Sequence, residues 1–346
     1  MTNLHQPTSA AERRSPAQRR GTARWFIWVL ACLMALLLGV VHGSTAIPLG
    51  AVLTALIHPG RGIVAVIVWQ IRLPRIVAAA LVGGALASAG ATMQALLQNP
   101  LADPYIVGAS AGAGLGAVVV ETVLPGTLLM APAAFFGALF SVFLSWTLSR
   151  GRGRSAMLTL LLAGYALSVM FSAISTFLMF AREQSLSAIF AWEMGGIHGM
   201  TWTTVAVTGV IMLLGLTLLV PERRHMNALL MGEDVALSVG VPVRRSQGIL
   251  LLSASLLTAA AVYAGGLIGF VGLVVPHVMR RLVGAEHERL LPMTFLAGAT
   301  FLMLADTLAE NLPPLGLLPV GVITAFLGGP YFLYLLADRG RGNRPN

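Results

Sequence analysis

The chain has 346 residues, of which 57% are apolar and only 10% are charged. A soluble protein of this length would carry about 25% charged residues, so the composition excludes a water-soluble globular domain and predicts an all-α polytopic membrane protein in contact with the lipid bilayer. The net charge of +9 could suggest nucleic-acid binding, but the charges lie between long apolar runs and form no basic patch. We therefore expect no nucleic-acid partner.

The N-terminal region divides into a polar, Arg-rich tail at residues 1–24 and an apolar run from Trp25 to Val41. A signal peptide has the same layout, with residues 43–46 as a cleavage region. An uncleaved first span is favoured, because the topology described below requires it.

Stretches without Asp, Glu or Arg predict the membrane spans. As one helix, the stretch 246–279 would measure about 51 Å against a hydrocarbon core of about 30 Å. Tyr263-Ala264-Gly265-Gly266 offers a break. With that break the stretches give ten spans: 25–60, 76–102, 104–120, 122–149, 155–181, 194–221, the two parts of 246–279, 290–305 and 311–337. The transmembrane domain is thus predicted at residues 25–337, followed by a second tail at 338–346.

Arginine placement supports ten crossings with both termini in the cytoplasm. Short cytoplasmic loops are enriched in basic residues, and all 22 basic residues of this chain are arginine. Ten crossings leave only Arg61, Arg72, Arg75 and Arg182 outside, whereas nine would turn the last two clusters outward.

Small residues recur at helical spacing within several predicted spans. Gly83, Gly84 and Gly90 lie in one span, and Gly108 and Gly112 lie at the start of the next. Such faces let helices approach closely in a membrane, so the spacing predicts a tightly packed bundle.

The segment 69–75 contains two arginines, Arg72 and Arg75, which flank Leu73-Pro74 at the outer end of the second span. We interpret it as a short external loop. Guanidinium groups bind carboxylates of a soluble partner well. Snorkelling of both side chains to lipid phosphates explains the pair equally well.

The cytoplasmic loop 221–247 predicts two short helices hinged at Gly232, with Glu233 and Asp234 early in the second. A structured amphipathic pair suggests a partner surface, although a hairpin lying on the membrane surface has the same pattern.

On the outer side, the segment 182–202 carries Arg182, Glu183 and several interfacial residues. Its tryptophans are either interfacial anchors or part of a short helix that gates a path.

Several kinds of chemistry are not expected. A Walker A motif requires lysine, which the chain lacks, so ATP hydrolysis is not expected here. Asp103, Glu121, Asp306 and Glu310 fall near predicted span ends, whereas an ion-coupled transporter usually keeps a carboxylate near the midplane. Histidine spacing and the lone Cys32 predict no metal site. We identify no catalytic residue and no directly bound cofactor.

The chain resembles the FecCD-type permease family, which comprises the membrane subunits of ABC importers for vitamin B12, haem and ferric siderophores. The resemblance covers nearly the whole chain from about residue 25. The segments that carry it are Arg72–Arg75, Gly90–Pro104, Gly108–Gly112, Leu161–Leu167, Trp192–Gly196, Gly269–His277, Glu286–Pro292, Ala305–Asp306, Leu318–Ala325 and Gly328–Pro330.

This resemblance implies a ten-helix permease of type II ABC importer architecture in a bacterial inner membrane. It implies a homodimer, two cytoplasmic ATPase subunits that bind ATP and magnesium, and a periplasmic substrate-binding protein. Arg72 and Arg75 then correspond to residues that dock the binding protein. Some relatives carry a third docking arginine where this chain has Glu310, so that contact is not transferred.

The resemblance also assigns residues to coupling and to the path. The loop 228–242 corresponds to helices that contact the ATPase, and 155–181 to the path lining, with 150–156 near an inner gate. The coupling residues are Leu230, Gly232, Glu233, Asp234, Ala236 and Gly240, and the path and gate residues are Gly164, Ser168, Ser172, Trp192, Gly195 and Gly196.

The expected cargo is inferred only from how common each kind of cargo is in this family. Iron chelates are the commoner cargo, so haem or a ferric siderophore is expected, with cobalamin as the alternative. An ion-coupled secondary transporter and a membrane scaffold without transport activity are the other classes of function considered.

Overall fold

The computed structural model describes residues 16–43, 45–60, 62–149, 156–181, 186–312 and 318–342, and every regular element within these ranges is helical. The elements are α1 (Pro16–Val41), α2 (Leu49–Ile57), α3 (Gly62–Val66), a π-helical turn (Ile67–Arg72), α4 (Leu73–Leu96), α5 (Ala109–Val123), α6 (Met130–Ser149), α7 (Ala156–Ala181), α8 (Leu186–Glu193), α9 (Trp202–Leu219), a 3-10 turn (Val220–Glu222), α10 (Arg223–Leu230), α11 (Glu233–Ser238), α12 (Val243–Gly265), α13 (Val271–Val283), α14 (His287–Glu310) and α15 (Val320–Gly342). The prediction of an all-α membrane protein is confirmed.

Eight of the described helical segments are long and apolar enough to cross a membrane. Two others are shorter: α5 has 15 residues and α13 has 13, which at 1.5 Å per residue gives about 22 and 20 Å. The predicted break near Gly265 is confirmed, because α12 ends there and Gly266 adopts a φ of 65°. The count of ten spans depends on α5 and α13 also crossing, and stays a prediction.

The external loop predicted at 69–75 is wrong. Gly62–Leu96 is one continuous helical segment of 35 residues, in which a π-helical turn ends at Arg72 and Pro74 lies in the first turn of α4. Proline has no N–H to donate, and the widened turn before it accommodates that loss without ending the helix. The charge-free stretch used to predict the second span begins only after Arg75. The sequence alone does not show that Arg72 and Arg75 both find partners inside the bundle, which allows the helix to continue through them.

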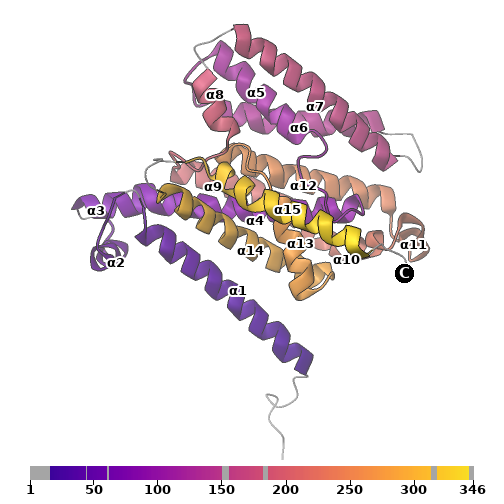
Figure 1. Ribbon diagram of the computed structural model, residues 1–346, viewed down its shortest axis with the longest axis horizontal. Coiled ribbons are helices and arrows are strands. Elements are labelled where there is room, and N and C mark those ends of the chain that lie inside the picture. The colour runs from indigo at the N-terminus through magenta and orange to yellow at the C-terminus, as the bar shows by residue number, and fades with distance from the viewer. Residues whose placement is uncertain are drawn as a thin grey trace, which may run out of the picture.

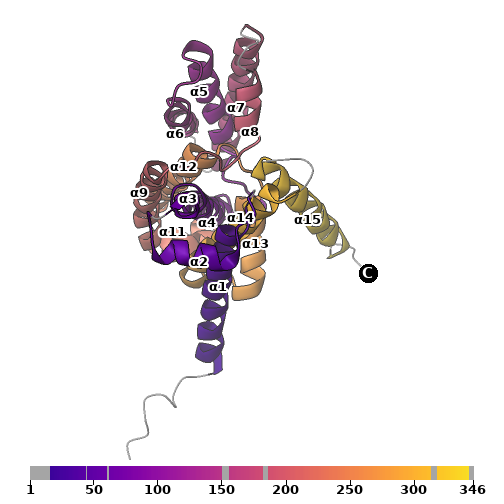
Figure 2. The ribbon, with the colours of Figure 1, turned by 90° about the vertical axis from the view of Figure 1, so that its left-hand side faces the viewer.

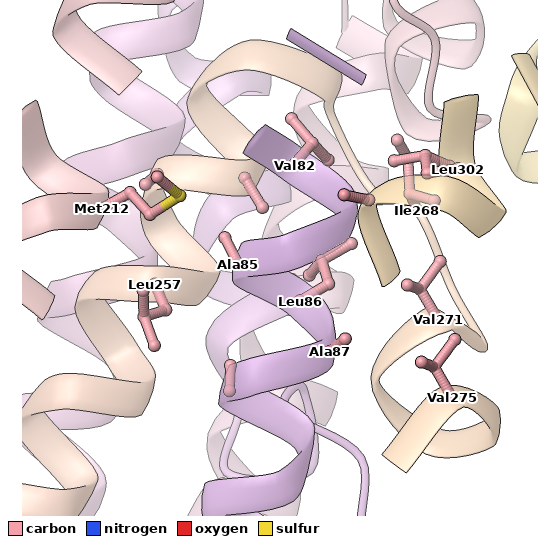
Figure 3. Packing of buried hydrophobic residues seen from close by; sticks show 14 of the residues in the cluster. Val82, Ala85, Leu86, Ala87, Met212, Leu257, Ile268, Val271, Val275 and Leu302 are labelled. Carbon is pink, nitrogen blue, oxygen red and sulfur yellow. The ribbon is translucent and has the colours of Figure 1, made fainter. Parts of the chain in front are cut away.

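The helix α4 forms the centre of the bundle, with α9 and α12 on one side and α13 and α14 on the other (Figure 1). In the apolar window of the segment 62–96, 83% of residues are buried. Figure 3 shows side chains of α4 between the two groups of neighbours; the labelled residues are Val82, Ala85, Leu86 and Ala87 on α4, Met212, Leu257, Ile268, Val271, Val275 and Leu302.

Glycines on α4 bring backbones into direct contact, as the small-residue spacing predicted. A Cβ added to Gly83 would overlap the carbonyl of Gly298 on α14, and one added to Gly90 would overlap the carbonyl of Gly272 on α13. Between α5 and α6, Gly112 and Gly137 meet in the same way. No hydrophobic effect drives helices together inside a lipid bilayer, so the close van der Waals packing at these glycines stabilises these pairs of helices instead.

The helices α5, α6, α7 and α8 form a separate layer on one side of the α4 bundle, and two perpendicular views agree on this (Figures 1 and 2). Only 22% of the apolar window of α7 and 28% of that of α6 are buried. On the other side, α1 packs along α14, and α15 packs on α13 and α14. A deeply buried centre therefore carries a layer in which α6 and α7 leave most of their apolar surface uncovered by the rest of the chain.

Candidate functional site

Arg72 fastens the end of α1. Arg72 is only 6% exposed. Its Nη1 atom donates hydrogen bonds to the carbonyls of Val40 and Val41, both at 2.8 Å. Its Nη2 atom donates to the Thr45 carbonyl. The last carbonyls of a helix lack intrahelical donors, so the guanidinium supplies what α1 needs there.

Arg75 lies in an ion triad between α4 and α14. Its Nε atom is 2.8 Å from Oδ2 of Asp306, its Nη2 atom is 3.0 Å from Oδ1, and its Nη1 atom is 3.0 Å from Oε1 of Glu310. The side chains of Arg75, Asp306 and Glu310 are 12%, 3% and 13% exposed. The triad carries one net negative charge, and Glu310 supplies its second carboxylate. Docking of another protein by Arg72 and Arg75 stays a prediction, since the contacts seen for both are internal.

At the opposite end of the bundle, α10 and α11 form the predicted pair of short helices, and this prediction is confirmed. Leu230 ends α10, Gly232 makes the turn with a φ of 112°, and Glu233 and Asp234 occupy the first turn of α11. Positive φ at Gly232 and at Gly240 (82°) favours glycine at both positions. We call α10, α11, the residues between them, and Val239 and Gly240 after α11 the helix pair.

Side-chain hydrogen bonds anchor the helix pair to the long helices. Asn227 of α10 accepts a 2.9 Å bond from the backbone N–H of His287 and lies 2.7 Å from its Nδ1 atom, at the start of α14. On α11, Glu233 accepts a 2.7 Å bond from Nε2 of Gln247 on α12, and Ala236 is fully buried. A displacement of the helix pair would therefore act directly on α12 and α14.

The exposed apolar side chains of the helix pair are absent from the coupling residues predicted from the sequence, which were Leu230, Gly232, Glu233, Asp234, Ala236 and Gly240. Met231 is 73% exposed, Leu237 58% and Val239 66%, and Val235 is also exposed. The sequence could have indicated them, because the helix pair has more apolar residues than one buried helix face can hold, so some of them must be exposed. Such a patch outside the membrane-spanning helices is typical of a protein contact surface.

The second candidate region is a cavity of about 810 Å³ between α5, α7 and α8. Two predicted path residues, Ser168 and Ser172, line it. The remaining lining residues are Ser110, Ala111, Gly114, Ser175, Thr176, Met179, Phe180, Phe190, Glu193 and Leu267. The cavity is thus bounded mainly by the layer of α5 to α8.

The other predicted path residues lie beside the cavity and join elements together. Gly164 allows the backbone of Val107 to approach α7. Gly195 and Gly196 tie the end of α8 to other helices: the Gly196 N–H donates to the Gly265 carbonyl at 2.9 Å, and the Gly321 N–H donates to the Gly195 carbonyl at 3.2 Å. The carbonyl of Trp192 packs so closely on Gly266 that no Cβ would fit there.

Two predictions fall partly outside the described residues. These are the inner gate at 150–156, of which only residue 156 is described, and the outer residues Arg182 and Glu183. The short helix predicted within 182–202 is present as α8, and whether it gates a path stays a prediction.

Two motif segments that carry the family resemblance contact each other. Gln94 of α4 donates from Nε2 to the Leu273 carbonyl at 3.2 Å and accepts at Oε1 from Nη1 of Arg280 at 3.1 Å. Pro104 packs against Gly272. The loop after α4 is thereby fixed against α13.

Comparisons with known proteins agree with this geometry. A cobalamin import system permease of Halobacterium salinarum is 45% identical over 276 residues, which cover 79% of this chain and 74% of the relative. A hemin transport system permease of Yersinia pestis is 41% identical over 78% of this chain and 83% of its own length. A vitamin B12 import system permease of Klebsiella pneumoniae is 38% identical over 94% and 97% of the two chains.

A solved inward-facing structure of a metal-chelate type ABC transporter matches with a TM-score of 0.80 at 30% identity, covering 90% of this chain and 98% of that chain. The sequence model of the FecCD transport family matches residues 30–338. This chain therefore belongs to the FecCD transport family and is a multi-pass permease subunit of an ABC importer.

Proposed function

We propose that this permease moves a bulky metal chelate across the bacterial inner membrane by alternating access. The observation that carries the proposal is the cavity of about 810 Å³ beside α7, in a chain whose relatives include permeases named for cobalamin and for hemin. Such a volume lies within the usual range for cavities that enclose organic ligands. Haem, a ferric siderophore and cobalamin all remain within this class.

The energy for transport comes from a separate ATPase in this proposal. The helix pair, with Met231, Leu237 and Val239 exposed, is the surface that an ATPase subunit covers. Its anchors at His287 and Gln247 pass a displacement of α10 and α11 to α14 and α12. Two permease copies and two ATPase subunits complete the transporter, with ATP and magnesium held by the ATPases.

A substrate-binding protein delivers the cargo at the end of the bundle opposite the helix pair. Arg72 and the Arg75 triad lie there, and they shape this surface by fixing α1 and α14 to α4. The sparsely packed α7 then shifts between states that differ in their contacts with cargo, and a partner can drive such a change only through unequal affinity for those states.

Reconstitution tests this function. The permease would be co-expressed with its ATPase and placed in nanodiscs, and ATP hydrolysis would be measured with empty and cargo-loaded binding protein. We expect the three proteins to co-purify and the loaded binding protein to stimulate hydrolysis. Cargo accumulation by the permease alone along a proton gradient would instead support the secondary-transporter class.

A further inference from the structure

The polar side chains of the cavity share one chemical property. Its described lining contains hydroxyls and one carboxylate but no arginine or histidine. The polar members are Ser110, Ser168, Ser172, Ser175, Thr176 and Glu193. A cargo group in this cavity therefore meets oxygen atoms and no fixed positive charge from the described lining.

Two of the hydroxyls are already committed as donors. Ser168 donates from Oγ to the Gly164 carbonyl at 2.8 Å, and Thr176 donates from Oγ1 to the Ser172 carbonyl at 2.9 Å. A hydroxyl has one proton and two lone pairs, so both groups can offer a cargo only an acceptor. The wall beside α7 is therefore richer in acceptors than its residue types alone would indicate.

Glu193 occupies a position that is energetically unfavourable for a negative charge. It is half-buried and forms no hydrogen bond or ion pair with any other described residue. It is also the last residue of α8, where the helix dipole disfavours a negative charge. Partial burial of an unpaired carboxylate is unfavourable as well. Sites that break such local rules are often functional.

The carboxylate of Glu193 faces the cavity wall contributed by α5. A Cβ added to Gly114, itself a lining residue, would lie 3.6 Å from Oε1 of Glu193. Gly114 thus leaves the carboxylate uncovered on that side. The hydroxyl acceptors of α7 and the carboxylate of Glu193 on α8 therefore line the same cavity.

We propose that Glu193, Ser168 and Thr176 form a selectivity wall for chelates whose edge carries N–H donors. The inference rests on the proposed function and narrows its cargo class. Cobalamin carries primary amides around its corrin ring, and each can donate to these oxygens. Haem carries two carboxylates, which would meet the negative charge of Glu193 without a compensating cation on the described lining. The wall therefore favours an amide-bearing corrinoid over a carboxylate-bearing haem.

A measurable preference follows. Hydrogen bonds to a charged acceptor are stronger than neutral ones, and a site built to accept hydrogen bonds rejects a ligand that cannot donate them. We expect removal of the Glu193 charge to lower uptake of the amide-bearing cargo by roughly tenfold. The same change removes repulsion of a carboxylate, so uptake of hemin should rise.

The test uses the complete transporter in proteoliposomes with cyanocobalamin and hemin as probes, each supplied on a binding protein that accepts it. ATP-dependent uptake would be compared for wild type, Glu193→Gln and Glu193→Ala. The matched control is Glu121→Gln, which removes a carboxylate from the end of α5 outside the cavity lining. The expected result is less cyanocobalamin and more hemin with both Glu193 variants, and no change in the ratio with the control.

Opposite changes for two probes cannot arise from misfolding, which would lower both. Uptake ratios within twofold of wild type for both Glu193 variants would overturn the selectivity wall while leaving the importer function intact. A wild-type transporter that takes up neither probe when ATP is supplied would overturn the selectivity wall, and would leave a ferric siderophore as the cargo of the proposed function.

Discussion

The α4 bundle and the layer of α5 to α8 differ in how much of their surface the rest of the chain covers. In the apolar window of Gly62–Leu96, 83% of residues are buried, against 22% for α7. Direct glycine contacts and the Arg75 triad join α4 to its neighbours, whereas α7 borders a cavity and leaves Tyr165, Phe177 and Phe180 exposed. A helix that the rest of the chain covers only partly can shift at a smaller free-energy cost, so we infer that the α4 bundle is the fixed frame and that transport rearranges α7 and its layer.

The largest expected effect is at the Arg75 triad in the frame. Arg75→Met would leave Asp306, which is 3% exposed, without its ion partner. Removal of one partner from a buried pair costs about 3–5 kcal/mol. We expect a correspondingly lower thermal unfolding midpoint in detergent, measured by fluorescence of the permease.

The double variant Arg75→Met with Asp306→Leu is the control, because it removes the most deeply buried ion pair, leaves Glu310 as the one remaining charge of the triad, and should recover most of the loss. A single variant that kept wild-type stability but bound the substrate-binding protein more weakly would mean that Arg75 docks a partner and does not fasten the frame.

Glycine substitutions compare the two regions directly. Gly90→Ala places a methyl group against the Gly272 carbonyl, whereas Gly114→Ala meets only the flexible carboxylate of Glu193 at 3.6 Å. Overpacking usually costs about 1–3 kcal/mol, and a rigid backbone neighbour places Gly90→Ala at the upper end. Gly114→Ala should be neutral or slightly stabilising, because alanine favours helix by up to about 1 kcal/mol. Equal unfolding midpoints for the two variants would contradict the difference between the backbone contact at Gly90 and the open cavity position at Gly114.

The helix pair offers a smaller effect that leaves the frame untouched. Leu237→Asp places a charge on an exposed apolar position of α11, and should weaken ATPase association by about tenfold, or 1.4 kcal/mol. Ser238→Asp, next to it and also exposed, is the matched control. Binding of purified ATPase to the permease in nanodiscs measures both, and an equal loss for the control would indicate general charge repulsion.

The smallest expected effect is a pH dependence of the α7 layer. Burial raises the pKa of Glu193 above its ordinary range, so its negative charge is lost at a higher pH than that of a free glutamate as the solution is acidified. Uptake of cyanocobalamin should therefore fall on acidification by less than tenfold. Glu193→Gln should remove this step from the pH profile, and a step that persists in the variant would assign it to another group.

Much of this arrangement could be predicted from the sequence. Apolar runs and arginine placement indicated the helical spans, and Gly265-Gly266 indicated the break between α12 and α13. The segment around Arg72 could not be predicted, because its helical continuation depends on carbonyls of α1 that lie far away in sequence. Glu193 lies within the predicted outer segment 182–202 but received no role, since its position in a hydroxyl-lined cavity becomes visible only when α5, α7 and α8 are assembled.

The most direct test of the central claim is uptake by proteoliposomes that contain the permease, its ATPase and the substrate-binding protein. The account predicts uptake of a metal chelate that requires ATP, stops when the Walker lysine of the ATPase is replaced, and is unaffected when the proton gradient is dissipated. Uptake that persists without ATP hydrolysis and follows the proton gradient would contradict it.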